Sequence, residues 1–163
     1  MTESPLLKPQ VLPRPKLQPP QMKAYQAIRP GATTVVVRNV PRQIGQEEFL
    51  RYVQIEGFFD YFHLPYNLLQ KRLLGYAFIN FVSHDMAVTF QKRWHGRVFP
   101  GRPSRKALDI ATAESQGWYD CLTRVKARKV HNLQKASYLP LINKDGHWLT
   151  AAQISELIDT PGK

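Results

Sequence analysis

The chain contains little cysteine, little acid and no long hydrophobic run. One cysteine among 163 residues, Cys121, excludes an intrachain disulfide framework and a zinc site built from several thiolates. No apolar stretch approaches the ~20 residues that a membrane-spanning helix needs. Prolines also interrupt the N-terminus where a signal peptide would carry its apolar core. We therefore expect an intracellular protein, nuclear or cytoplasmic or both, with no membrane partner.

Sequence signatures of catalysis are also missing. The five histidines form no His-x-x-x-His or Glu-x-x-His grouping, and no glycine-rich phosphate loop follows a strand. A lone cysteine such as Cys121 is usually inert. The sequence therefore predicts neither enzymatic activity nor a metal or other cofactor.

The shortage of acid leaves a formal net charge of +11, from 23 Lys and Arg against 12 Asp and Glu. The basic excess is spread over residues 1–137, and only residues 138–163 are slightly acidic. Such a distribution favours a polyanionic partner, nucleic acid before membrane, because amphipathic insertion signals are absent. Solubility alone is the alternative that charge leaves open.

Composition divides the chain into four parts. Residues 1–32 form a proline-rich basic leader, which we expect to be disordered. Such a leader is either a linker or a docking segment for SH3-like or WW-like partners. Residues 33–113 carry one folded domain, residues 114–137 a basic amphipathic helix, and residues 138–163 a tail with a short helix. We expect a monomer.

Residues 33–113 alternate between strand and helix patterns. Strands are predicted at Thr34–Arg38, Tyr61–Leu64, Gly75–Phe81 and Ala107–Ala111, and helices at Gln46–Ile55 and from Ser83 to Trp94. The order βαββαβ is that of a ferredoxin-like α+β sandwich, in which two helices cover one face of a four-stranded antiparallel sheet. The other face is left for a ligand.

Alternation in the third strand places two rings on that uncovered face. Ala77, Ile79 and Phe81 suit the core beneath the helices, so Tyr76 and Phe78 point the other way. Exposed rings provide platforms for unpaired bases. The alternative is that a further element covers them.

The octamer Leu74 to Phe81 resembles the RNP octamer of the RNA recognition motif, the RRM, at seven of its eight positions. Val35 to Val40 lies where the paired hexamer belongs. Residues 33–122 resemble more closely the C-terminal RRM of the Mei-two-like family. The resemblance is carried by Thr33 to Pro41, Asp60 to Pro65, Gly75 to Asn80 and the later Gln116-Gly117. It implies an RRM fold and an RNA-binding regulator.

The sequence departs from a typical RRM at Val36, where the hexamer usually carries an aromatic ring. Tyr61 and His63 on the second strand could replace the lost stacking platform. We expect Asn80 and Asn39 to hydrogen-bond base edges or sugars. Phosphate contacts are expected from basic residues on the first strand, the loops and the C-terminal helix; these are Arg38, Lys71, Arg72, Arg105, Lys106, Arg124 and Arg128.

The C-terminal helix has two possible positions. Its apolar stripe, Trp118, Leu122 and Val125, could lie on the sheet and mask Tyr76 and Phe78. It could instead pack beside the domain and extend the basic surface, which we favour.

The sequence thus predicts a single-stranded RNA-binding protein in post-transcriptional regulation. Other RNA-processing proteins could dock on the proline-rich leader or the C-terminal helix. The alternative is an RRM used as a protein-interaction module within a ribonucleoprotein.

Overall fold

The computed structural model describes residues 25–100 and 106–159. The first part of the chain forms β1 (Thr34–Arg38), α1 (Gln46–Val53), β2 (Phe59–His63), the small hairpin β3 (Tyr66–Asn67) and β4 (Arg72–Leu73), and β5 (Tyr76–Phe81). The second part forms α2 (His84–Trp94), β6 (Asp109–Thr112), α3 (Trp118–Leu122), the 3-10 turn η2 (Ala127–Lys129), α4 (Val130–Lys135), β7 (Leu141–Lys144), β8 (His147–Trp148) and α5 (Ala151–Asp159). No helix in these two ranges is long and apolar enough to span a bilayer.

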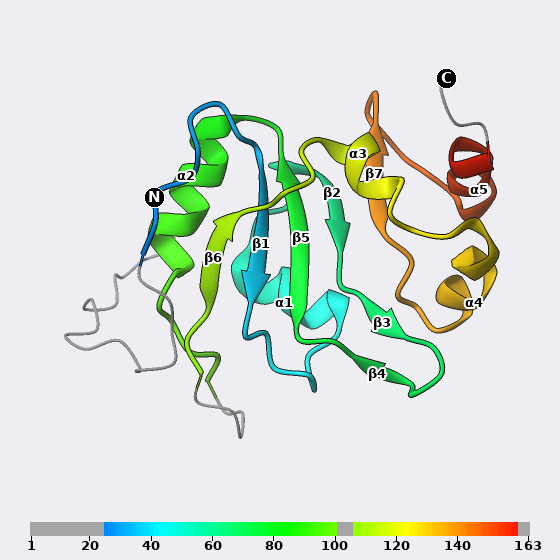
Figure 1. The fold of residues 1–163 in the computed structure, drawn as a ribbon, viewed down its shortest axis with the longest axis horizontal. Helices are drawn as coiled ribbons and strands as arrows, with labels where there is room; N and C mark the ends of the chain where they lie inside the picture. Colours follow the sequence, from blue (N-terminus) through cyan, green and yellow to red (C-terminus); the bar gives the residue numbers. More distant parts are fainter. Residues whose placement is uncertain (1–24, 101–105, 160–163) are drawn as a thin grey trace.

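The larger sheet has six strands in the order β6-β1-β5-β2-β7-β8, with antiparallel pairing throughout (Figure 1). Its first four strands, with α1 and α2 on one face, are the predicted ferredoxin-like βαββαβ unit. Two further strands, β7 and β8, extend the sheet beyond β2. They were not predicted, although Asp145-Gly146 is a hairpin-turn dipeptide, and both residues have the positive φ that such a turn needs.

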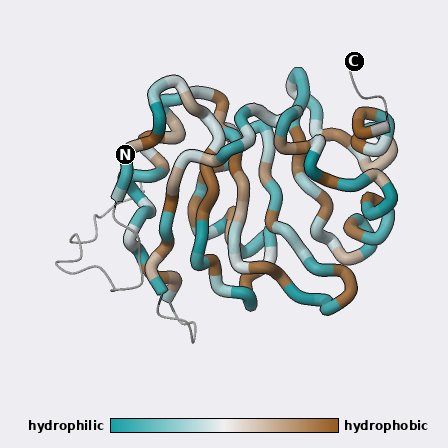
Figure 2. Tube along the Cα trace, in the orientation of Figure 1, coloured by the Kyte–Doolittle hydropathy of each residue, from teal (hydrophilic) through white to brown (hydrophobic). Residues whose placement is uncertain are grey.

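The main core lies between the sheet and the two helices. Val35 and Val37 of β1 and Ile79 of β5 pack with Phe49 of α1 and Phe90 of α2, all nearly or fully buried. Figure 2 shows hydrophobic segments running through the central strands, with hydrophilic stretches where the strands end. Ser83 caps α2, because its side chain accepts a hydrogen bond from the backbone N–H of Met86. The core therefore fixes which strand residues face away from the helices.

The segment before β1 is more ordered than predicted. Residues 25–32 were assigned to the disordered leader, but Ile28 is buried in the main core. The side-chain amide of Gln91 donates a hydrogen bond to the Gln26 carbonyl oxygen at 2.7 Å. This part of the domain prediction was wrong, because two buried apolar residues, Ile28 and Ala32, and hydrogen bonds to its backbone hold the segment against α2 and β6. The rest of the predicted leader, residues 1–24, lies outside the described residues.

The segment after β6 is not the single helix predicted for residues 114–137. It forms α3, η2 and α4, and Lys126 between them has an extended backbone conformation, with ψ of 132°. Thr123 favours the break because its hydroxyl donates to the Asp120 carbonyl oxygen at 2.7 Å, in competition with the helical pattern. The break lets Leu122, Val125, Val130 and other residues of the segment join a second core cluster.

Candidate nucleic-acid interface

The sheet face opposite α1 and α2 carries three rows of side chains that cross the strands. The strand register defines them. The outer row contains Asp109, Arg38 and Tyr76; the middle row contains Ala111, Val36, Phe78 and His63; the inner row contains Thr34, Asn80 and Tyr61. As predicted from the alternation, Tyr76 and Phe78 are on this face, away from the helices.

The inner row is covered by the chain that leaves β6. The backbone N–H of Gly117 donates to the Thr34 hydroxyl at 2.8 Å. The Gln116 side chain accepts from the backbone N–H groups of Thr33 and Thr34, both at 3.0 Å, and donates to the Thr34 carbonyl oxygen at 3.0 Å. Figure 1 shows this connection passing from β6 across the sheet to α3. The segment thus closes one end of the face and leaves side chains of the other two rows, among them Tyr76 and Phe78, partly exposed.

Coverage of the inner row overturns the role predicted for Asn80. Its side chain is only 5% exposed and is engaged within the protein. The amide oxygen accepts hydrogen bonds from the hydroxyls of Thr33 at 2.7 Å and Thr34 at 2.6 Å, and the amide nitrogen donates to the Asp60 carboxylate at 2.7 Å. Asn80 therefore organises the closed end of the face and is not available to a base edge.

Tyr61 is also excluded as a stacking platform. It points to the predicted face but is 1% exposed, packed with Leu122, Val125 and Ile142 in the second core cluster. Burial raises the pKa of its phenol well above the ordinary value. The predicted compensation for Val36 therefore does not come from Tyr61, because the C-terminal segment occupies the space above its ring.

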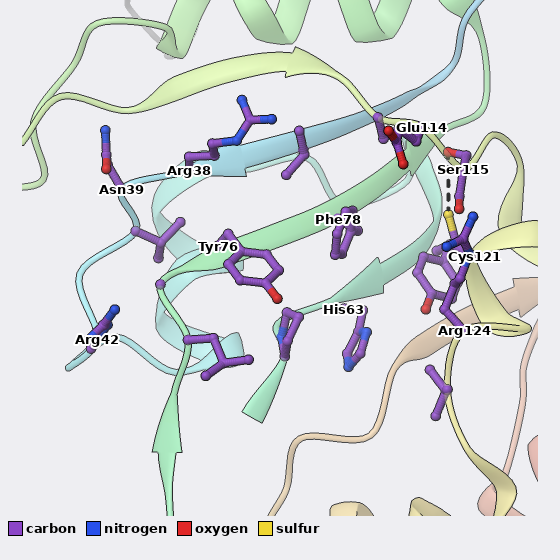
Figure 3. A pocket seen from close by; sticks show the side chains of 18 of the residues that line it. Arg38, Asn39, Arg42, His63, Tyr76, Phe78, Glu114, Ser115, Cys121 and Arg124 are labelled. Atoms are coloured by element: carbon purple, nitrogen blue, oxygen red, sulfur yellow. Dashed lines mark hydrogen bonds between the residues drawn. The ribbon is translucent and has the colours of Figure 1, made fainter. Parts of the chain in front are cut away.

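This face carries a hollow of about 960 Å³ (Figure 3), and five residues of the outer and middle rows line it: Val36, Arg38, Tyr76, Phe78 and His63. Tyr76 and Phe78 are partly exposed within it, with ring centroids 5.6 Å apart and planes at 86°. Val36 lies beside them and is 7% exposed. The C-terminal segment therefore neither seals the two rings nor leaves the whole face open. It forms one wall of the hollow, through Cys121, Arg124 and Val125.

His63 lines the hollow beside Phe78. Burial lowers the pKa of its imidazole to about 4, because the charged form would be poorly solvated there. At neutral pH the ring is therefore uncharged. A neutral aromatic ring next to Phe78 is the type of side chain on which a base can stack.

Cationic side chains stand around the rings. Arg38, Arg42, Lys106 and Arg124 all line the hollow. Arg38 also forms an ion pair with Asp109 of the neighbouring strand at 3.4 Å. These side chains come from separate segments of the chain, so a ligand in the hollow meets positive charge on several sides.

Asn39 lines the hollow as well, at the exit of β1. It has a φ of 67°, and its amide nitrogen donates to the Ala107 carbonyl oxygen at 2.9 Å. That donor is used to hold the chain before β6, which limits Asn39 to contacts through its other polar atoms.

The remaining predicted phosphate contacts are not part of the hollow. Lys71 and Arg72 are exposed on the β3–β4 hairpin, where the Arg72 guanidinium donates to the Gln70 side chain at 2.9 Å. Arg128 is exposed in η2. None of the three lines the hollow. Arg105 lies outside the described residues.

Sequence reasoning missed two charged residues of the hollow, Arg42 and Glu114. Arg42 could have been found, because β1 and β5 are antiparallel and the loop after β1 must lie beside the start of β5. A Cβ on Gly75 would lie 3.3 Å from Arg42 Nε, so the missing side chain leaves room for the guanidinium. Glu114 follows the last strand of the domain, and only the path of the next segment brings it to the hollow.

The hollow offers no activated nucleophile. Cys121 is buried, and burial together with the nearby Asp120 carboxylate raises the pKa of its thiol to about 11. Its Sγ donates weakly to the Ser115 carbonyl oxygen at 3.9 Å (Figure 3). Within the described ranges, no group of three or more His, Cys, Asp and Glu side chains is placed to hold a metal ion.

Comparison with known families finds one matching model, described as RNA recognition motif 2, over residues 32–126. Among curated proteins, the chain is 33% identical over 115 residues to Protein MEI2-like 5 of Oryza sativa subsp. japonica, which covers 69% of this chain and 13% of that protein. It is 33% identical over 87 residues to Meiosis protein mei2 of Schizosaccharomyces pombe, covering 52% of this chain and 12% of that protein. The chain thus spans about an eighth of the length of these relatives. The resemblance to the Mei-two-like family is confirmed.

Solved structures with similar folds include one described as the Rna15 RRM with bound RNA (GU). It has a TM-score of 0.45 and 14% identity, covering 63% of this chain and 98% of that one. Another is the Sxl-lethal protein/RNA complex, with a TM-score of 0.45, 20% identity, and coverage of 50% of this chain and 47% of that one.

Proposed function

Because the chain belongs to the RNA recognition motif 2 family, we propose that it binds single-stranded RNA in the hollow on the open face of its sheet. The observation that carries the proposal is the pair Tyr76 and Phe78, two large rings left accessible in a hollow lined by cationic side chains. The part of each ring that stays exposed gains nothing in a monomer with no ligand, whereas each base stacked on such a ring contributes about 1–3 kcal/mol.

The role of each side chain in RNA binding follows from its chemistry. Bases stack on Tyr76 and Phe78, with His63 as a third, uncharged surface. Arg42, Lys106 and Arg124 contact phosphates around the rim, and these contacts carry affinity without reading sequence. Arg38 also lines the hollow, and its guanidinium forms the ion pair with Asp109. Lys71 and Arg72 on the β3–β4 hairpin contact only an RNA long enough to leave the hollow.

The cellular role that we propose is post-transcriptional regulation of RNA. Meiosis protein mei2 is several times longer than this chain, so a role in meiosis is not part of the proposal. Docking of other RNA-processing proteins on the proline-rich leader or on the C-terminal segment is part of the same proposal.

Titration of a fluorescent single-stranded RNA tests the stacking step. We expect Tyr76→Ala and Phe78→Ala each to weaken binding by about 5- to 150-fold, the equivalent of one lost base stack. Phe58→Ala is the matched control, because Phe58 is 47% exposed but does not line the hollow. If both hollow variants bind like the wild-type chain, bases do not stack on these rings.

Salt dependence tests the phosphate contacts. Each neutralised phosphate contributes about 0.7 to the slope of log affinity against log salt for a single strand. Arg42→Ala should therefore flatten the slope by about that amount. Arg51→Ala removes the same charge from an exposed position on α1, outside the hollow, and should leave the slope unchanged. Absence of RNA binding at low salt would instead favour the protein-interaction alternative.

A further inference from the structure

One acidic side chain projects into this otherwise basic hollow. Among the described residues that line it, Glu114 is the only Asp or Glu, and it is exposed. No ion pair joins Glu114 to a described residue. In the proposed complex, phosphates lie beside the cations of the rim, and a carboxylate with no ion pair to a described residue opposes them. Its position in a nucleic-acid site therefore needs a reason other than charge.

The position of Glu114 is set by its neighbours. The backbone N–H of Ala113 donates to the Thr34 carbonyl oxygen at 3.0 Å, and Ser115 is buried against Cys121. Glu114 thus stands between two anchored residues, at the closed end of the hollow. Figure 3 shows it on the side of Phe78 away from Tyr76. A base stacked on Phe78 would turn one edge toward this closed end.

The chemistry of base edges indicates which base fits. A carboxylate accepts hydrogen bonds and donates none when it is ionised. The Watson–Crick edge of guanine presents two adjacent donors, N1–H and the N2 amino group, which match the two carboxylate oxygens. Guanine also has an acceptor on that edge, O6, but adenine, cytosine and uracil lack a pair of adjacent donor groups there, so a carboxylate cannot form the same two-point contact with them.

We propose that Glu114 is a specificity-determining residue that selects guanine at the base position on Phe78. This inference rests on the proposed function, because it assumes that a base stacks on Phe78. It adds a preference that neither the aromatic rings nor the cations can supply, since both accept any nucleotide.

The experiment compares three uridine-rich single-stranded RNAs that differ only at one central base, which is guanine, inosine or adenine. Inosine keeps N1–H and lacks the N2 amino group. The wild-type chain should bind the guanine RNA about 5- to 150-fold more tightly than the adenine RNA, the discrimination of a good bidentate base contact, with inosine between them. In Glu114→Gln, which exchanges one acceptor for a donor group, the three affinities should converge.

Two further variants control for charge and folding. Glu47→Gln removes the same charge from an exposed position on α1 and should keep the guanine preference. Glu114→Asp keeps a carboxylate one methylene shorter and should keep part of that preference. A circular-dichroism melt of each variant identifies any loss of folding.

Two results would overturn the inference. In the first, the wild-type chain binds all three RNAs equally. In the second, Glu114→Gln strengthens binding of all three by the same factor, which would mean that the carboxylate only repels phosphate. Failure of the proposed function has a different signature, because Tyr76→Ala and Phe78→Ala would then leave the affinity for every RNA unchanged.

Discussion

Replacing Asn80 by alanine should destabilise the protein strongly, although Asn80 belongs to the RNP octamer. The side chain is 5% exposed, and its three hydrogen bonds to Thr33, Thr34 and Asp60 measure 2.6–2.7 Å. A hydrogen bond between neutral groups contributes about 1 kcal/mol net, and one to a charged group about 1.5–3 kcal/mol. We therefore expect Asn80→Ala to lower the free energy of unfolding by about 3–5 kcal/mol, a large part of the ~5–15 kcal/mol typical of a domain.

Urea denaturation measures this loss as a lower midpoint at an unchanged slope. Asn132→Ala, at an exposed position of α4, is the matched control and should change stability by less than about 0.5 kcal/mol. RNA affinity is measured at a temperature where Asn80→Ala is still folded, and it should be close to that of the wild-type chain. A variant as stable as the wild-type chain that nevertheless loses RNA affinity would refute this reasoning, because Asn80 would then contact RNA.

Two other predictions concern His63 and Gly75. Burial lowers the pKa of His63 from its ordinary 6.5 to about 4. Between these two pH values the imidazole is protonated in the unfolded chain but not in the folded chain. Stability should therefore decrease over that range by at most about 3 kcal/mol, and urea midpoints should depend less on pH in His63→Gln; identical pH profiles would contradict this. Gly75→Ala should cost about 1–2 kcal/mol, since its φ is +91°, and should also weaken RNA binding by displacing Arg42. Gly57→Ala is the control, because Gly57 has a similar φ of +88° and a Cβ there would meet no neighbour within 4 Å. Thermal melts should show a similar loss of stability in this variant, with unchanged RNA affinity. Equal RNA affinity in both variants would exclude a role for the placement of Arg42.

Local patterns predicted the domain well. Strand alternation has a period of two, so once Ile79 and Phe81 were assigned to the core, Tyr76 and Phe78 had to face the other side. The order of the strand and helix patterns then predicted the ferredoxin-like sandwich, and the family resemblance agreed with it. These features could be predicted because each depends on residues that are close in sequence or on a motif of fixed spacing.

Whether each site residue is exposed or covered could not be predicted in the same way. Asn80 and Tyr61 are on the predicted face, yet they are covered, because the chain after β6 crosses that end of the sheet. An apolar stripe such as Trp118, Leu122 and Val125 shows that a segment packs, but not against which surface. Glu114 was missed for the same reason, since its proximity to Phe78 depends on a long-range path.

The pairing of β7 with β2 has a practical consequence for recombinant fragments. The family match ends at residue 126, whereas β7 lies at Leu141–Lys144. A fragment cut at the shorter boundary would leave the backbone of β2 unpaired along one side and would remove part of the apolar cover of Tyr61, including Ile142. Unpaired strand edges are templates for aggregation. Fragments intended for binding assays or crystallisation should therefore extend through α5.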